Sequence, residues 1–172
     1  MILEILKEPD PRLRKISKPV EKVDDSIRKL LSDMLETMYD DNGAGLAAPQ
    51  VGTLLRMIVV DVSYKEGHPQ EILKMVNPEI TYKSEDEITY NEGCLSVPQG
   101  FAELTRPKII KVRYLDEFAI SQEKTFDEWA ARAVLHEVDH LNGILFIDHL
   151  SRLKKEVILK KSRKNRELDS VT

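Results

Sequence analysis

A short stretch of the chain holds residues that could bind a metal ion and activate water. His136-Glu137-Val138-Asp139-His140 follows the HExxH pattern. Residues four apart lie on one face of a helix, so His136 and His140 can bind the same ion. Glu137 lies about 100° further round the helix, where it can reach a metal-bound water but cannot be a third close ligand. The pattern predicts a metal-dependent hydrolytic site; the alternative is two hydrogen-bonded core histidines beside an exposed Glu137.

A catalytic site of this kind needs a third protein ligand and one open position for water. The extended protease pattern HExxHxxGxxH would place a third histidine at position 146. Gly143 matches that pattern, but position 146 is Phe146, and His149 falls three residues later. The arrangement typical of those proteases is therefore absent.

Cys94 is a better candidate for the third ligand. It is the only cysteine, and it lies in the segment Glu92-Gly93-Cys94-Leu95-Ser96, directly after a predicted strand. A thiolate is a strong ligand for borderline or soft divalent ions. A lone cysteine can also be a small buried hydrophobic side chain, and composition alone leaves both interpretations open.

Two helices frame these residues. The first is predicted from Asp24-Asp25, which can cap free backbone N–H groups, to Asn42-Gly43, a C-cap pair. Residues 1–22, with three prolines, predict an extended arm before it. The second helix, which carries both histidines, is predicted from Thr125, in a possible Thr125-x-x-Glu128 capping box, to Asn142-Gly143.

The middle of the chain predicts β-structure. Residues 57–62 are apolar and β-branched, and residues 108–115 alternate charged with apolar side chains. Residues 79–83 and 87–91 flank an acidic turn and predict a hairpin. No regular βαβ alternation is present. We therefore expect an α+β fold with mixed, mainly antiparallel sheets around the HExxH helix, an N-terminal helix and a C-terminal helix.

We expect one metallohydrolase domain over residues 1–172, with a basic C-terminal helix or tail at 151–172. That tail holds eight Lys or Arg and three Asp or Glu, a net charge of +5, whereas the whole chain carries −4. A basic tail can dock on an anionic surface, or it can simply be a solvated helix face. The overall negative charge argues against a general nucleic-acid binder, and we expect no specific DNA partner.

The chain is expected to be cytoplasmic. Its first residues lack the basic and apolar regions of a signal peptide, and no window approaches the roughly 18 apolar residues of a membrane span. A single cysteine excludes an internal disulfide and fits a reducing compartment.

Three segments together resemble the peptide deformylase family over residues 1 to about 150. They are Gly43-Ala44-Gly45-Leu46-Ala47-Ala48-Pro49-Gln50, the Glu92–Ser96 segment and the HExxH segment, which match the family's GxGLAAPQ, EGCLS and HExDH motifs in order. The resemblance implies that Cys94, His136 and His140 hold one divalent metal. It implies native Fe²⁺, with Zn²⁺, Ni²⁺ or Co²⁺ as replacements in a purified sample.

The implied reaction removes formate from the N-formylmethionine of new bacterial polypeptides. Gln50, through its side-chain amide, and Leu95, through its backbone N–H, would stabilise the developing oxyanion. Glu137 would take the proton of the water and pass it to the departing amine. Without the resemblance, Gln50 would be interpreted as a polar residue after a Pro-terminated loop rather than as a catalytic one.

The resemblance also points to substrate-binding residues. Gly43 and Gly45 would let the substrate backbone lie against their segment, although both could be plain turn formers. Trp129, Arg132 and Ala133, one or two turns before His136, are candidates for the methionine pocket. Trp129 could instead be a core residue, and Arg132 could contribute only its aliphatic stem.

Glu92 and Arg106 occupy positions that usually carry these charges in the family, and we predict that they pair near the metal loop. The alternative is two separate surface charges. Two departures from the family pattern, Leu135 in place of Gln and no glycine in residues 116–124, affect only the loop shape and the pocket lining.

Two other functions compete with a deformylase. An endoprotease would need the downstream ligand that position 146 lacks. A non-catalytic metal-stabilised module would need a closed site with four ligands. Ribosome docking through the basic tail is a further hypothesis that accompanies the deformylase function.

Overall fold

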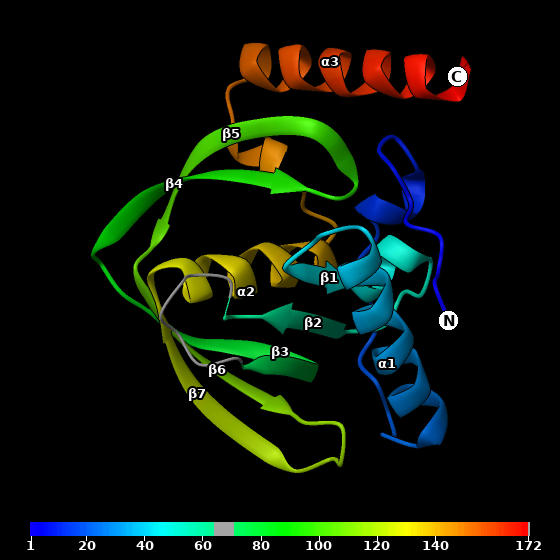
Figure 1. Cartoon of the computed structure of the whole chain (residues 1–172). Coiled ribbons are helices and arrows are strands. Elements are labelled where there is room, and N and C mark those ends of the chain that lie inside the picture. Colours follow the sequence, from blue (N-terminus) through cyan, green and yellow to red (C-terminus); the bar gives the residue numbers. More distant parts are fainter. Residues whose placement is uncertain (64–70, 172) are drawn as a thin grey trace.

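The computed structural model describes residues 1–63 and 71–171, and side chains as far as residue 165. Five strands form one sheet in the order β1-β2-β3-β6-β7, and β4 pairs with β5; every pairing is antiparallel. Figure 1 shows α2 between the two sheets, α1 at one side and α3 across the β4–β5 hairpin. The predicted α+β fold is confirmed. The helices and strands are α1 (Asp25–Asp40), α2 (Glu128–Leu141), α3 (Arg152–Val171), β1 (Gly45–Ala47), β2 (Met57–Asp61), β3 (Ile72–Lys83), β4 (Glu87–Cys94), β5 (Val97–Pro107), β6 (Ile109–Leu115) and β7 (Ser121–Asp127).

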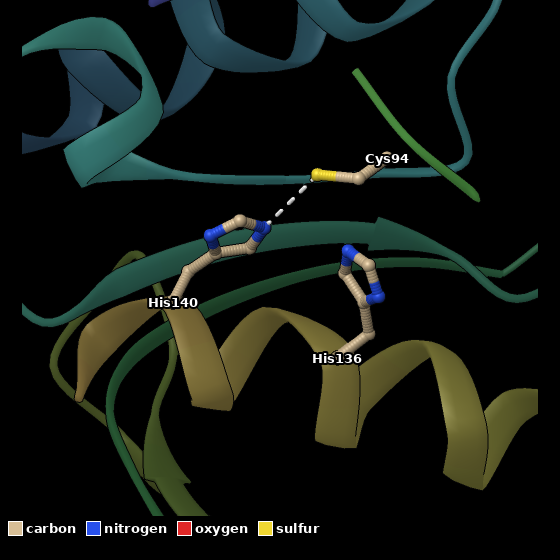
Figure 2. A group of neighbouring side chains, drawn as sticks. All are labelled: Cys94, His136 and His140. Atoms are coloured by element: carbon tan, nitrogen blue, oxygen red, sulfur yellow. Dashed lines mark hydrogen bonds between the residues drawn. The ribbon is translucent and has the colours of Figure 1, made fainter. Parts of the chain in front are cut away.

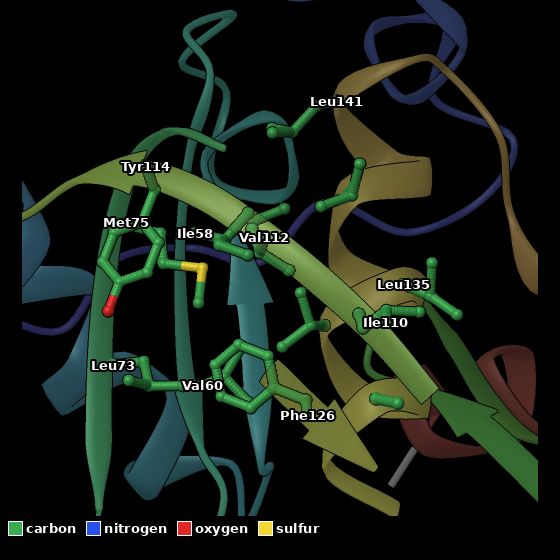
Figure 3. Packing of buried hydrophobic residues seen from close by; sticks show 14 residues of the cluster. Ile58, Val60, Leu73, Met75, Ile110, Val112, Tyr114, Phe126, Leu135 and Leu141 are labelled. Carbon is green, nitrogen blue, oxygen red and sulfur yellow. The ribbon is translucent and has the colours of Figure 1, made fainter. Parts of the chain in front are cut away.

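Strand β2 is buried on both faces, because helices cover both sides of its sheet. Side chains alternate along a strand, so Ile58 and Val60 join the cluster under α2, whereas Met57 and Val59 join the cluster under α1. Figure 3 shows the α2 side of this core, where Ile110 and other residues of the sheet meet the helix. A continuous apolar run in the sequence is the consequence of this double burial.

Helix α1 begins and ends where its sequence predicts. The Asp24 side chain accepts from the Ile27 N–H at 3.1 Å, and Asn42 adopts a left-handed φ of 56° after the last turn. The arm before α1 is extended apart from one 3₁₀ turn, Pro11–Arg14. Both predictions are confirmed.

The predicted hairpin of residues 79–83 and 87–91 is wrong. Both segments are strands, but β3 pairs with β2 and β6, and β4 pairs with β5 in the other sheet. The turn between them is a corner, in which Ser84 N donates to the Ile109 carbonyl and Lys108 N donates to the Asp86 carbonyl. Strand β3 has β2 on one side and β6 on the other, so neither of its edges is available to pair with β4.

The predicted start of the HExxH helix is three residues too early. Thr125 belongs to β7, where it pairs with Lys111 of β6, and α2 begins only at Glu128. The capping box is absent, and Asp127 stands at the N-cap without a side-chain cap hydrogen bond. The predicted end is confirmed, since Asn142 is the C-cap and Gly143 has a left-handed φ of 72°.

The predicted C-terminal helix is α3, and it packs against β5. Ile158 and Leu159 contact the apolar cluster that includes Val97 and Leu104. The opposite face exposes Leu153 and Val157 together with several lysines. The tail side chains of residues 166–172 lie outside the described residues. Within the described part of the chain, no helix has the length and apolar character needed to cross a membrane.

Replacing Gly143 with alanine should destabilise the fold. The left-handed backbone costs a residue with a Cβ about 1–2 kcal/mol. In addition, a Cβ would lie 2.4 Å from the Arg14 carbonyl oxygen. Gly52→Ala is the matched control, because Gly52 is also left-handed at φ 85° but its nearest contact is a flexible arginine tip. Urea unfolding should show a larger loss for Gly143→Ala than for Gly52→Ala, and equal losses would contradict the clash.

Candidate metal centre

Three potential metal ligands meet between α2 and the end of β4. His136 and His140 lie one turn apart on α2, and Cys94 is the last residue of β4, at a register shift in the β4–β5 pairing. One ligand atom from each residue lies within 4.8 Å of the others. Figure 2 shows both imidazoles directed toward the side of the site that holds the thiol. The structure thus brings together all three residues that the sequence predicts as ligands.

The geometry of this cluster fits a metal ion. Two ligand atoms on one tetrahedral ion lie about 3.3–3.6 Å apart when bond lengths are those of Zn–S and Zn–N. Cys94 Sγ and His140 Nε2 are 3.3 Å apart. Beside the cluster, Glu137 Oε1 is buried without a hydrogen-bond partner among the described residues, as expected where a metal-bound water would stand. The Cys-His-His donor set suits a single borderline divalent ion.

Glu137 lies at the wall of this site and is 4% exposed. Burial disfavours its charged form and raises the pKa of its carboxyl to about 7. A carboxyl with a pKa near neutrality can both accept a proton and return it. This environment suits the acid–base role that the HExxH pattern predicts.

The buried carboxylate of Glu92 fixes the His136 ring through a hydrogen bond to its Nδ1 atom. Glu92 accepts from His136 Nδ1 at 2.8 Å, from Arg106 Nε at 2.7 Å and Nη2 at 2.9 Å, and from Arg132 Nη1. The predicted pairing of Glu92 with Arg106 is confirmed. Although burial alone would raise the pKa of Glu92, the hydrogen bonds from His136 and Arg106 lower it well below its usual value. The bond to Nδ1 leaves Nε2 of His136 as the nitrogen available to a metal.

The same network extends to the far side of Arg106. Arg106 Nη1 donates to Asp139 Oδ2 at 3.0 Å, and the same oxygen lies 2.9 Å from His149 Nε2. His149, which the sequence excludes as a metal ligand, is therefore an outer member of the charged network. Sequence reasoning missed this contact and the Glu92–Arg132 pair, although Asp139 belongs to the HExDH motif.

Hydrogen bonds fix the orientation of the Gln50 amide. Gln50 Oε1 accepts from the Ala47 N–H at 2.9 Å, so the Nε2 group must point the other way. Nε2 donates to Ser96 Oγ at 3.0 Å and lies 3.6 Å from Cys94 Sγ. The amide donor thereby lies beside the Cys94 thiol of the Cys-His-His cluster.

Two glycines of the GAGLAAPQ segment make room for catalytic candidates. A Cβ on Gly45 would lie 2.4 Å from Glu137 Oε2, and a Cβ on Gly43 would lie 2.7 Å from Leu95 Cδ1. Both distances are too short for real contacts. Gly45 is therefore needed for the packing of the buried Glu137, and Gly43 leaves room for the Leu95 side chain, reasons that the sequence did not reveal.

A pocket of about 710 Å³ opens onto this cluster, large enough for the first residues of a peptide. The Arg132 guanidinium is engaged elsewhere, because Nη2 donates to the Ile88 carbonyl and the group lies over the Tyr90 ring. The pocket is lined by every residue that the sequence predicts as catalytic or substrate-binding and by two of the predicted ligands: Gly43, Gly45, Gln50, Cys94, Leu95, Trp129, Arg132, Ala133, His136 and Glu137.

Replacing Glu92 with glutamine should weaken both the fold and the metal site. Removing one partner of a buried ion pair costs about 3–5 kcal/mol, and loss of a hydrogen-bond partner behind a metal-binding histidine lowers metal affinity by about 10–100-fold. Urea unfolding of metal-free protein and a chelator competition with Zn²⁺ measure the two effects. Glu156→Gln is the control, since its pair with Arg152 is 62% and 94% exposed. A Glu92→Gln protein with unchanged stability and affinity would contradict this role.

Comparisons with known proteins agree with the site. The model of the polypeptide deformylase family matches residues 2–156. A peptide deformylase of Rhizorhabdus wittichii is 51% identical over 169 residues, with 94% of each chain covered. A peptide deformylase of Rickettsia prowazekii is 50% identical, with 95% of each chain covered.

Solved structures give the same result. The crystal structure of a peptide deformylase from Legionella pneumophila superposes with a TM-score of 0.93 at 42% identity, covering 100% of this chain and 99% of that one. The Ehrlichia chaffeensis peptide deformylase in complex with actinonin has a TM-score of 0.90 at 42% identity, covering 95% and 97%. The metal-ligand cluster, the fold and these matches together establish that the chain belongs to the peptide deformylase family of hydrolases.

Proposed function

We propose that the chain removes the formyl group from N-formylmethionine at the N-terminus of newly made bacterial polypeptides and releases formate, in the cytoplasm. One observation carries the proposal: a buried Glu137, whose Oε1 has no hydrogen-bond partner within the described part of the chain, lies beside a Cys-His-His cluster at a peptide-sized pocket. Family membership supports the same reaction. We infer that residues 1–172 act as one metallohydrolase domain.

Cys94, His136 and His140 would hold one divalent ion, and we expect Fe²⁺ as the native ion, with Zn²⁺, Ni²⁺ or Co²⁺ able to replace it. When bound, the ion lowers the pKa of its water, so that hydroxide is available near neutral pH. Within the described residues, the cluster contains three potential ligands, which leaves a fourth position open and disfavours a purely structural site.

The protein groups around the ion would stabilise the developing oxyanion and transfer the proton. Gln50 Nε2 and the Leu95 N–H donate to the formyl oxygen as negative charge develops on it. Removal of one such donor typically costs about 3–4 kcal/mol of barrier. Glu137 accepts the proton of the attacking water and delivers it to the departing methionine nitrogen.

The substrate would lie along β1. This strand is at the edge of the five-stranded sheet, so its outer hydrogen-bonding groups can pair with an extended peptide regardless of sequence. Gly45 is the first residue of β1, Gly43 precedes the strand by two residues, and both line the pocket. The methionine side chain would enter the pocket beside Trp129, Ala133 and the stem of Arg132.

Formate release from a formyl-Met peptide tests the proposal. Wild type loaded with Fe²⁺ under anaerobic conditions should release formate, and metal-loaded Glu137→Ala should be slower by about 10²–10⁴-fold, because the acid–base group is lost. Equal metal content of the two proteins is the control. Absence of formate with the fresh ferrous wild type would refute the function, and a fully active Glu137→Ala would refute the role of Glu137.

Helix α3 offers a surface for the ribosome, which we infer as a partner. Its inner face is packed against β5, whereas its outer face carries exposed lysines beside Leu153 and Val157. An anionic RNA surface attracts such a face. The exposed lysines are Lys154, Lys160, Lys161 and Lys164.

Changing these four lysines to glutamate should weaken ribosome binding and flatten its salt dependence, by roughly 0.9 in the log–log slope for each lost phosphate contact. This variant keeps the packing of α3, which a truncation would remove. The control changes four exposed lysines outside α3, namely Lys15, Lys18, Lys22 and Lys83. Sedimentation with ribosomes at several salt concentrations measures binding, and equal binding of wild type and the α3 variant would exclude this surface.

A further inference from the structure

The N-terminal arm contacts both segments that carry the proposed oxyanion donors. The Leu6 N–H donates to the Gln50 carbonyl at 2.7 Å, and the Glu8 N–H donates to the Ser96 carbonyl at 2.9 Å. These two backbone bonds connect the Gln50 segment with the segment that contains Leu95. The residue between them, Lys7, lines the pocket.

The Lys7 ammonium is bound to the backbone of Leu95. Its Nζ donates to the Leu95 carbonyl oxygen at 2.9 Å in a partly buried position. Leu95 and Ser96 form the tight turn between β4 and β5, where Cys94 pairs with Val97. The direction of the Leu95 N–H therefore depends on the orientation of this turn. A hydrogen bond from a charged donor is about twice as strong as a neutral one, so it can hold the turn in one orientation.

The arm itself is anchored on both sides of Lys7. Leu6 is buried, and the Glu8 side chain is 10% exposed and accepts from Arg163 Nη2 of α3 at 2.7 and 3.0 Å. Because its neighbours are fixed, Lys7 needs little further ordering to reach Leu95. The ammonium is thus part of a prearranged contact at the rim of the pocket.

We propose that Lys7 is a positioning residue for the reaction, whose ammonium holds the Leu95 carbonyl so that the Leu95 N–H points to the developing oxyanion. The inference rests on the proposed function for its kinetic consequence only. Lys7 touches neither the metal ligands nor Gln50 in the contacts described. A purely structural lysine would contribute to stability or substrate affinity, whereas a positioning lysine contributes to the rate of the chemical step.

Lys7→Met tests the proposal, since methionine keeps the apolar stem and removes the ammonium. With metal-loaded enzyme and a formyl-Met peptide, kcat should fall by about tenfold, within the range that misplaced catalytic groups cost, while KM changes by less than about twofold. Lys7→Arg restores a charged donor and should recover most of the lost kcat. Lys15→Met is the matched control, because Lys15 lies exposed in the same arm and should leave kcat and the melting temperature unchanged.

A second measurement does not depend on activity. In ¹⁵N-labelled, metal-free protein, the amide signals of Leu95 and Ser96 should shift in Lys7→Met and not in Lys15→Met. If Lys7→Met does not fold, Lys7→Gln supports the same comparison.

Unchanged kcat together with unchanged Leu95 and Ser96 signals would overturn the proposal, as would a loss of melting temperature and KM without a loss of kcat. If wild type releases no formate, the proposed function fails, and the amide signals still decide whether Lys7 orients Leu95.

Discussion

The buried carboxylate of Glu92 is the interaction on which the site depends. It lies on β4, and its partners lie on β5 (Arg106) and on α2 (Arg132 and His136). Because charges are costly to bury, a buried cluster of charged side chains is tolerated only when each charge has a partner of opposite sign. Here the Glu92 carboxylate pairs with the guanidinium groups of Arg106 and Arg132, and the Asp139 carboxylate pairs with Arg106. The balance ties the β4–β5 hairpin to the helix and thereby fixes Cys94 against the two histidines.

Close packing near the site leaves little room for a side chain at Gly43 and Gly45. At Gly45 the limiting neighbour is the Glu137 carboxylate, and at Gly43 it is the Leu95 side chain. Strand β1 and helix α2 can therefore approach closely only because Gly45 lacks a Cβ, and the missing Cβ of Gly43 leaves room for Leu95 in the β4–β5 turn. Helix α2, which carries the candidate ligands, is bound to β4 through the charged contacts of Glu92, and it packs closely against β1 because Gly45 has no side chain.

Local patterns in the sequence predicted the parts of the protein that depend on local geometry. The candidate ligands His136 and His140 follow from helical spacing, and the ends of α1 follow from its capping residues. The pairing of β3 and β4 and the start of α2 could not be predicted in this way. Thr125 has the local pattern of a helix cap, but it belongs to β7, because its pairing with Lys111 of β6 overrides the local preference. Contacts such as Lys7 with Leu95, 88 residues apart, leave no periodic signal.

The pair between Glu8 and Arg163 joins residues 155 positions apart. Contacts that close so long a loop carry a large entropic cost and form after the local elements exist. The two histidines, one helical turn apart, need no such closure. The two histidines are thus neighbours wherever α2 is formed, whereas Cys94 and the pocket wall join them only when segments far apart in the sequence pack together.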